Sequence, residues 1–193
     1  MDIKLFDLDN RLSLCASMVR KNHRVADIGT DHAYLPIYLA LENRITRGVA
    51  SDINEGPISK ARENIHKYGL ENIIDTCVSN GLDGIEKYEP TDIVICGMGG
   101  ELIAQIIENS SYVKKQGVRL ILQPMTTIRE LREYLQSGFS TIDENIVHED
   151  NKLYQIIYVE YDGISREYSD AELELGIKNI ENGGELFEKL LCS

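Results

Sequence analysis

The sequence has few basic residues, and this shortage limits the partners it can take. Its 193 residues include 20 Lys and Arg against 32 Asp and Glu, which gives a net charge of -12. Affinity for nucleic acid depends largely on the neutralisation of phosphates by Lys and Arg. The net charge therefore argues against a broad basic face. Because residues 161–193 hold a disproportionate share of the acid, a local basic surface on the first part stays open.

Features that mark export, membrane insertion or metal binding are also lacking. No apolar run approaches the roughly 20 residues that cross a bilayer, and no basic start precedes an apolar run and a cleavage site. The cysteines are scattered, without the close pairs typical of zinc sites or secreted frameworks. We expect a cytoplasmic protein with reduced thiols and neither a membrane nor a metal partner.

Short apolar segments alternate with helical ones from residue 25 onward. Predicted strands, rich in Val and Ile, cover residues 25–28, 47–53, 73–79, 92–97, 118–123, 139–149 and 152–161, and amphipathic helices cover 57–69, 101–110 and 126–138. Asn54 is expected to cap the first of these helices and Gly69 to end it. Strand and helix in alternation predict parallel strands with right-handed crossovers.

The last two strands are joined by too few residues for a crossover helix, so they predict an antiparallel hairpin. We expect an α/β fold of the Rossmann-type class I methyltransferase kind, with a seven-stranded, mostly parallel sheet and a C-terminal antiparallel hairpin. This domain covers residues 1–161, and a short helical appendage covers 162–193.

The loop after the first strand indicates the ligand. It contains Gly29 but not the G-x-G-x-x-G pattern that binds a dinucleotide, and two acids near a diphosphate would repel it. S-adenosylmethionine is cationic, so Asp27 can hold its ammonium group while Gly29 lets the backbone approach. Asp52, at the end of the second strand, can accept from ribose hydroxyls, with Ile53 beside the adenine ring.

Each aspartate also has a structural interpretation, because a single Asp at a strand end is more often a turn or cap residue than a ligand contact. Their combination on successive strands favours a nucleoside-type cofactor, and a nicotinamide cofactor is poorly supported.

The segment CGMGG, residues 96–100, follows the fourth strand. Its backbone groups and open space suit a flat group next to the methyl donor, although a tight turn is the alternative.

Several motifs carry a resemblance to a family: VADIGTDHAYLPIYLA, DINEGPISKARENI, NGLDGI, ICGMGGELIAQIIE, RLILQPMTTIRELREYL and EDNKLYQIIYVE. In order and spacing, the chain from residue 8 to 160 resembles the bacterial tRNA (adenine-N1)-methyltransferases of the TrmK type. The resemblance implies methylation of N1 of adenine-22 in tRNA by S-adenosylmethionine.

The resemblance and the residue chemistry together give a set of predicted site residues. Asp31 is the predicted catalytic residue. The predicted cofactor-binding residues are Asp27, Gly29, Thr30, His32, Asp52, Ile53, Asn80, Gly81, Gly97, Met98 and Gly99. The predicted substrate-binding residues are Arg11, Tyr34, Gly100, Gln123, Pro124, Arg129 and Arg132.

The resemblance places the catalytic role of the family's DH motif on Asp31, and the chemistry of adenine is consistent with this role. N1 has an in-plane lone pair, so attack needs alignment rather than deprotonation. A carboxylate that accepts from the N6 amine stabilises the positive charge that develops on the base. The alternative for Asp31 is a helix cap. His32 either orders the loop or contacts substrate, and Tyr34 either stacks on the base or packs in the core.

The chain departs from the family at three places. Ser79, Asn80 and Gly81 stand where the family often has Gly-Asp-Gly, and Asn80 can still bond to adenine. Met125 stands where Asn is frequent. The 32 residues after Tyr161 hold only a short helix pair in place of a coiled-coil-like domain, which indicates a reduced appendage or a truncated chain.

Basic residues that could contact phosphate are spread over the chain: Arg11, Arg20, Lys21, His23, Arg24, Lys114, Lys115, Arg129 and Arg132. We expect modest, salt-dependent tRNA binding. The alternatives are a methyltransferase for a small molecule or protein, a non-catalytic tRNA-binding module, and more distantly a nicotinamide oxidoreductase.

Overall fold

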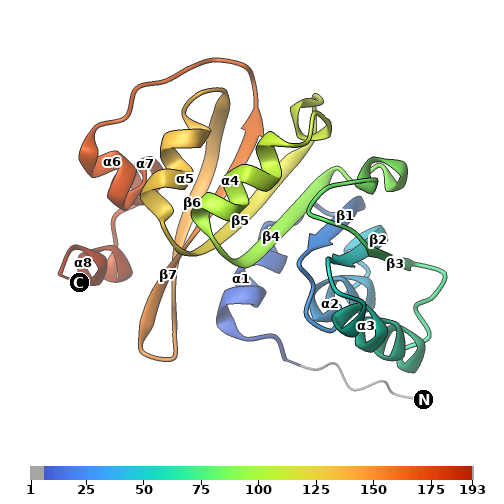
Figure 1. Cartoon of the computed structure of the whole chain (residues 1–193). Helices are drawn as coiled ribbons and strands as arrows, with labels where there is room; N and C mark the ends of the chain where they lie inside the picture. The colour runs from blue at the N-terminus through green and yellow to red at the C-terminus, as the bar shows by residue number, and fades with distance from the viewer. Residues whose placement is uncertain (1–6, 193) are drawn as a thin grey trace. The chain divides into compact units, whose positions relative to one another are not determined.

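The computed structural model describes residues 7–192, and its seven strands hydrogen-bond in the order β3-β2-β1-β4-β5-β7-β6 (Figure 1). The strands are β1 (His23–Ile28), β2 (Ile45–Asp52), β3 (Ile74–Val78), β4 (Asp92–Gly99), β5 (Arg119–Thr126), β6 (Phe139–Glu149) and β7 (Lys152–Tyr161). β2 pairs in parallel with β1 and β3, whereas β7 pairs antiparallel with β5 and β6. The predicted α/β sheet with its C-terminal antiparallel hairpin is confirmed.

Eight α-helices and two short 3-10 helices are found in the described part of the chain. The α-helices are α1 (Asn10–Met18), α2 (Tyr34–Leu41), α3 (Glu55–Lys67), α4 (Gly100–Glu108), α5 (Ile128–Leu135), α6 (Asp170–Leu175), α7 (Ile177–Asn182) and α8 (Glu185–Leu191), and the 3-10 helices are η1 (Ile85–Tyr88) and η2 (Tyr112–Lys114). None of the helices in residues 7–192 is long and apolar enough to cross a membrane.

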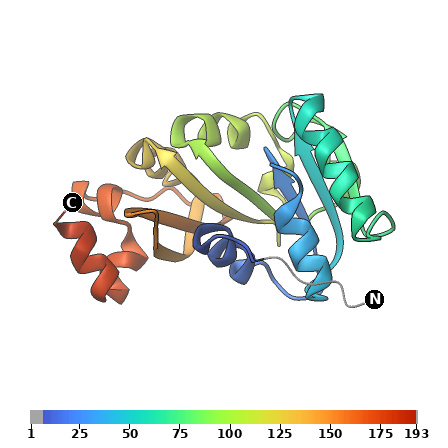
Figure 2. The same cartoon turned by 90° about the horizontal axis from the view of Figure 1, so that it is seen from below.

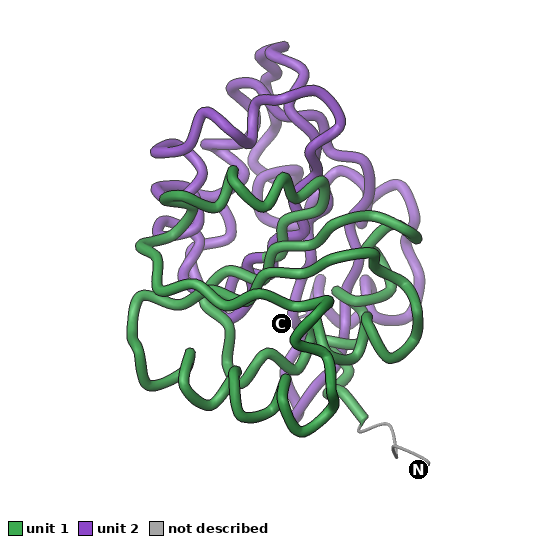
Figure 3. The backbone as a smooth tube through the Cα atoms, turned by 90° about the vertical axis from the view of Figure 1, so that its right-hand side faces the viewer, with its two compact units in different colours: residues 1–94 green, residues 95–193 purple. Residues whose placement is uncertain are grey.

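The chain divides into two compact units, residues 1–94 and 95–193, and the boundary falls within β4 (Figure 3). The expected division into residues 1–161 and 162–193 stays a prediction.

In the first unit, α2 and α3 pack on β1, β2 and β3. The last four residues of β1 are all buried, as is typical of a parallel strand that is covered on both faces. Helix α3 begins at Glu55, two residues before the expected start. Asn54 occupies the N-cap position, but its side chain makes no capping bond, and the expected cap is wrong in this respect. Its backbone N–H instead donates to Asp52 Oδ1 at 2.7 Å.

In the second unit, β4 and β5 run further than predicted. β4 continues through Gly99 instead of ending at residue 97, and the N–H of Gly97 donates to the side-chain oxygen Oε1 of Gln123 at 3.1 Å. β5 continues to Thr126, and α5 therefore begins only at Ile128. Helices α4 and α5 contact each other and both contact β5.

The three C-terminal helices pack beside the β6–β7 hairpin, with α7 and α8 against β6 (Figure 2). A buried ion pair joins them to the sheet. Arg132 of α5 is 3% exposed, and its Nε donates to Glu144 Oε1 of β6 at 2.9 Å. Its Nη1 donates to the carbonyl oxygens of Leu173 and Glu174, and Glu144 accepts from the backbone N–H of Lys178 at 2.9 Å.

The surroundings of this ion pair require a glycine. Gly176 has a φ of +89°, and a Cβ at this position would lie 2.5 Å from both carboxylate oxygens of Glu144. Only glycine both adopts this backbone conformation without strain and leaves room for the ion pair. The packing of Glu144 and Arg132 against the turn between α6 and α7 therefore requires glycine at position 176.

We expect Arg132→Met to lower the free energy of unfolding by about 3–5 kcal/mol, because it leaves Glu144 buried and without its partner charge. Arg129→Met, on the same helix, is the matched control. Arg129 is 33% exposed and pairs only with exposed carboxylates, so its loss should cost much less than the loss of Arg132. Urea denaturation of both variants measures the difference, and equal losses would contradict a structural role for the buried pair.

Candidate functional site

The loop after β1 has an uncommon backbone. Gly29 has a φ of +74°, and His32 and Ala33 follow with φ values of +64° and +58°. Two successive non-glycine residues in the left-handed region are strained, and such strain clusters at functional sites. The N–H groups of Gly29 and Thr30 both donate to the carbonyl oxygen of Ser51 at 2.8 Å, which holds the loop against β2.

Asp27 is a buried carboxylate at the end of β1. It is 7% exposed, and Oδ2 accepts from the hydroxyl of Thr30 at 2.6 Å. The same hydroxyl accepts from the N–H of Ala33 at 3.2 Å. Burial raises the pKa of Asp27 to about 6, with a further increase from the charge of Asp31 and a partial decrease from the Thr30 hydrogen bond. Its environment favours a cationic ligand, whose charge would offset the desolvation of the carboxylate.

Thr30 was predicted to bind the cofactor, but its side chain is buried and holds the loop together. It is 2% exposed, and its hydroxyl donates to Asp27 and accepts from the N–H of Ala33. Thr30 therefore orders the loop that presents the neighbouring residues.

Asp31 and His32 stand at the tip of this loop. The side chain of Asp31 is 81% exposed, and His32 Nδ1 lies 2.5 Å from Asp31 Oδ1. This nitrogen is buried, and the two atoms are not aligned for a hydrogen bond. The side-chain amide of Asn64 on α3 donates to the carbonyl oxygen of His32 at 3.0 Å. The strained turn is thus held by a hydrogen bond from α3, while the carboxylate of Asp31 is exposed to solvent.

Two alternative roles from the sequence are now decided. The N-cap of α2 is Ala33, without any side-chain capping bond, so Asp31 is not a helix cap. Tyr34 is 39% exposed and does not pack in the core. Its ring stacks on the ring of His32, with centroids 5.3 Å apart and planes inclined by 21°. The half-buried ring of His32 and the exposed ring of Tyr34 thus form a stacked aromatic pair close to Asp31 in the chain.

The ends of β2 and β3 carry the other predicted cofactor residues of the first unit. Asp52 is paired in register with Val78, and the N–H of Ser79 donates to the carbonyl oxygen of Asp52 at 2.9 Å. Ile53 is 60% exposed, which leaves an apolar side chain open at this edge. Asn80 is also exposed, and Gly81 follows with a φ of +58°. The loops after β1, β2 and β3 therefore follow one edge of the sheet, as expected for parallel strands.

In the second unit, the CGMGG segment is positioned by the end of β5. Gln123 is fully buried, accepts from the N–H of Gly97, and donates to the carbonyl oxygen of Pro124 at 2.8 Å. A Cβ at Gly100 would lie 2.1 Å from the carbonyl oxygen of Thr127, so helix α4 requires glycine at its first residue. The hydroxyl of Thr127 accepts from the N–H of Glu101 at 3.2 Å. The segment is an extended strand end closely packed on the 126–127 turn, and not a tight turn.

Three residues predicted to contact substrate are buried and bonded within the second unit. Gln123 has no exposed surface and accepts from the N–H of Gly97, whereas Gly100 is buried against Thr127. Arg132 forms the buried ion pair with Glu144. Substrate contacts by these three residues stay predictions.

Other basic candidates are at the surface but already paired with acids. Arg129 contacts Glu133, Asp170 and Glu174, which raises its pKa, and Arg11 contacts Asp9 at 3.3 Å. A phosphate would have to compete with these carboxylates. Phosphate contacts by Arg11 and Arg129 stay predictions.

Sequence reasoning missed the supporting residues, because their roles depend on neighbours distant in the chain. Asn64 and Thr127 act through bonds to His32 and Glu101, which lie 32 and 26 residues away. Thr127 directly precedes an amphipathic helix, a position that indicates an N-cap. Its hydroxyl makes no capping bond to α5 and instead accepts from the N–H of Glu101 at the start of α4.

Comparison with known proteins decides the family. A family model described as a methyltransferase domain matches residues 8–157. The tRNA (adenine(22)-N(1))-methyltransferase of Bacillus subtilis is 39% identical over 166 residues, which cover 82% of this chain and 70% of that protein. The chain belongs to the tRNA (adenine(22)-N(1))-methyltransferase family. The predicted membership is confirmed.

Further similarities agree with this membership. The crystal structure of a putative tRNA (m1A22) methyltransferase of Streptococcus pneumoniae in complex with S-adenosyl-L-methionine has a TM-score of 0.89 and 34% identity, and covers 96% of this chain and 87% of that one. The ribosomal protein L11 methyltransferase of Staphylococcus aureus is 30% identical over 72% of this chain, but this region is only 43% of that protein. The match is thus more complete with the tRNA-modifying family.

We expect Asp27→Asn to raise the free energy of unfolding at pH 7.5. The pKa of Asp27 is about 6 in the folded chain against an ordinary value of 3.8, so the folded state takes up a proton more readily than the unfolded state. Above pH 6 the ionised carboxylate therefore costs the folded state about 3 kcal/mol, and this cost disappears as the pH falls below 4.

Asparagine removes the charge and keeps an oxygen that accepts from Thr30. Urea denaturation at pH 7.5 and pH 4 should show a gain of up to about 3 kcal/mol that shrinks at the lower pH. A variant that is less stable than the wild type at pH 7.5 would contradict the desolvation of Asp27.

Proposed function

We propose that this protein transfers the methyl group of S-adenosylmethionine to N1 of adenine-22 in tRNA. The exposed Asp31 carboxylate on the strained loop carries this proposal, together with membership of the family. A cytoplasmic location follows from a tRNA substrate and stays a prediction.

The residues at the edge of the first unit fit the cofactor. S-adenosylmethionine supplies an electrophilic methyl group on a sulfonium, next to an amino acid part and an adenosine. The buried carboxylate of Asp27 would hold the ammonium group, since its desolvation is offset by a positive ligand. The positive φ of Gly29 leaves the loop without a side chain where the methionine part approaches.

The adenosine part has its own candidates. Asp52 would accept from the ribose hydroxyls, and it already accepts from the N–H of Asn54, which fixes its orientation. The exposed side chain of Ile53 would cover one face of the adenine ring, and Asn80 would bond to its edge. Gly97, Met98 and Gly99 are proposed to provide backbone contacts to the methyl donor.

Asp31 would stabilise the charge that develops on the base. Nucleophilic attack forms the bond from N1 to the methyl carbon, and the electron pair of the breaking carbon–sulfur bond goes to sulfur. The base becomes cationic, so a carboxylate that accepts from N6–H lowers the barrier electrostatically. His32 and Tyr34 form the aromatic pair on which the adenine would stack.

Two alternatives remain for comparison. A protein substrate is favoured only by the partial similarity to the ribosomal protein methyltransferase. A non-catalytic tRNA-binding module would not need a buried acid such as Asp27, which costs stability when the cofactor is absent. Both alternatives predict no methylation of adenine-22.

The affinity for S-adenosylmethionine should fall as the pH drops below about 6, because protonated Asp27 cannot pair with the ammonium group. We expect the Kd to rise about tenfold for each pH unit below the pKa. Isothermal titration calorimetry between pH 5 and 8 measures it. Asp27→Asn should bind weakly at every pH, and a wild-type Kd that is independent of pH would argue against this contact.

Asp31→Ala should lower kcat for methyl transfer at least about 100-fold and leave the Kd for S-adenosylmethionine within about twofold. The reason is that Asp31 acts on the base and not on the cofactor. Asp83→Ala, which removes another exposed aspartate of the first unit, is the matched control and should retain activity.

The assay follows labelled methyl transfer to a tRNA transcript and to the same transcript with guanine at position 22. Label that requires both adenine-22 and Asp31 supports the proposal. Equal labelling of the two transcripts would exclude the proposed position, and full activity of Asp31→Ala would exclude the proposed catalytic residue.

A further inference from the structure

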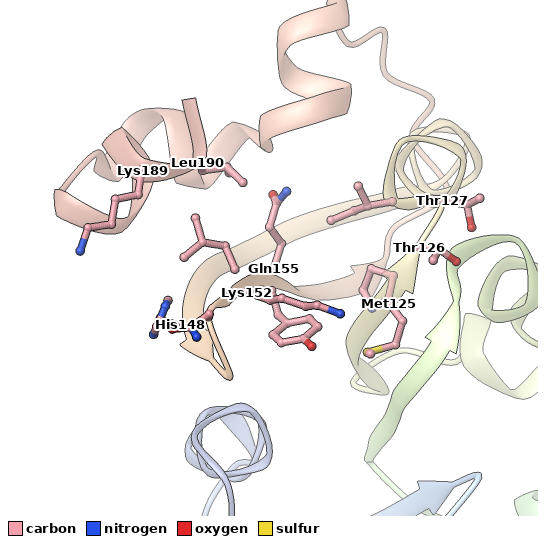
Figure 4. A pocket seen from close by; sticks show the side chains of 13 residues that line it. Met125, Thr126, Thr127, His148, Lys152, Gln155, Lys189 and Leu190 are labelled. Carbon is pink, nitrogen blue, oxygen red and sulfur yellow. The ribbon is translucent and has the colours of Figure 1, made fainter. Parts of the chain in front are cut away.

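A pocket of about 580 Å3 lies within the second unit (Figure 4). Its walls come from three places: the end of β5 and the turn after it, the β6–β7 hairpin, and helix α8. The lining residues are Pro124, Met125, Thr126, Thr127, Ile128, His148, Asn151, Lys152, Leu153, Tyr154, Gln155, Lys189 and Leu190. Its volume falls in the range of about 300–1,000 Å3 typical of ligand sites.

The charge of this pocket contrasts with the charge of the chain. The whole sequence has a net charge of -12, yet none of the 13 described lining residues is acidic. Two of them are lysines, Lys152 and Lys189, and His148 is a third nitrogen-bearing side chain. A lining with lysines and without carboxylates favours an anionic ligand.

Lys152 is the strongest of these candidates. Lys189 already pairs with Glu185 on α8 at 2.7 Å. No ion pair joins Lys152 to any acid among residues 7–192. Figure 4 shows its amine directed into the pocket toward Met125. A lysine without an acidic partner is available to bind a phosphate as a point charge.

The other lining groups suit the base and sugar of a nucleotide. The half-buried Tyr154 contributes an aromatic ring, and Met125 is 43% exposed beside it. Asn151 and Thr126 supply an amide and a hydroxyl at the rim. Gln155 is committed elsewhere, because its Oε1 accepts from Arg132 and Asn179. A cation, an aromatic ring and neutral polar groups are the usual components of a single-stranded RNA contact.

The pocket begins at the turn that supports the CGMGG segment. Thr126 Oγ1 would lie 3.3 Å from a Cβ at Gly99, and Thr127 bonds to the start of α4. Both threonines also line the pocket. Within the second unit, the pocket and the segment proposed to contact the methyl donor thus share one turn.

We propose that this pocket binds one nucleotide of the tRNA other than the methylated adenosine, with Lys152 paired to its phosphate and Tyr154 stacked on its base. The inference rests on the proposed function for the identity of the RNA. It also assigns a role to α8, which provides the Lys189 and Leu190 side of the pocket. An acidic protein would in this way concentrate its RNA contact in a small basic site.

The test measures tRNA binding directly, by fluorescence anisotropy with an unmodified transcript at several salt concentrations. Lys152→Glu should weaken binding at least about tenfold at low salt, and Lys152→Gln should reduce the slope of log K against log salt by about one. Lys60→Glu, on the exposed surface of α3, makes the same change in net charge and is the matched control. Its tRNA affinity should stay within about twofold of wild type.

Variants of Tyr154 provide a second test of the pocket. Tyr154→Phe keeps an aromatic ring and should retain tRNA binding, whereas Tyr154→Ala should weaken it about tenfold or more. The Kd for S-adenosylmethionine and the Tm of the Lys152 variants should not change, because Lys152 is exposed at a hairpin. Tm of the Tyr154 variants shows whether any loss of binding comes from unfolding.

The outcomes separate this inference from the proposed function. If wild type binds tRNA but methylates no adenine-22, the proposed function fails while the Lys152 comparison still tests the pocket. If Lys152→Glu binds tRNA as well as Lys60→Glu does, the pocket proposal is overturned whatever the activity. If both variants lose the same affinity, overall charge and not the pocket determines binding, and the proposal is equally overturned.

Discussion

The second unit depends on one buried ion pair, Arg132 with Glu144. Two charges with 3% and 2% exposure are costly to remove from water, and they are tolerated only where their hydrogen bonds are satisfied. Here the guanidinium also donates to Gln155 and to the carbonyl oxygens of two residues of α6, while Glu144 accepts from the first turn of α7. Helix α5, the hairpin and helices α6 and α7 are therefore joined to each other by one set of bonds.

This constraint has a consequence for the site. The end of β5 leads into α5, and the same turn supports Gly99 and Gly100 and forms one wall of the proposed nucleotide pocket. The ion pair joins α5 to β6, and α8 contacts β6, so the elements that line the pocket all meet at the hairpin. The short C-terminal region thus takes part in the structure of the second unit and supplies part of a candidate site.

In the first unit, the main constraint is the strained loop after β1 and the buried carboxylate of Asp27. A buried acid with a raised pKa and two residues in left-handed conformations both cost stability. The hydroxyl of Thr30 and the amide of Asn64 hold the strained loop in place. The result is an exposed carboxylate, Asp31, on a loop whose backbone is held by hydrogen bonds from Thr30 and Asn64.

The sequence alone determined the α/β class, the seven strands and the candidates Asp27 and Asp52, because apolar periodicity and residue chemistry are local properties, whereas the candidate Asp31 came from the resemblance to the family. The two strands of the hairpin were predicted with their observed bounds, since a strong alternating pattern and a short connection leave few alternatives. The ends of β4 and β5 were not, because a side chain, Gln123, satisfies the Gly97 backbone from another strand. Arg132 and Arg129 look equivalent in sequence, three residues apart on one helix. Only the tertiary structure decided that one is buried with Glu144 and the other exposed, because burial depends on which distant segments pack against each face of the helix.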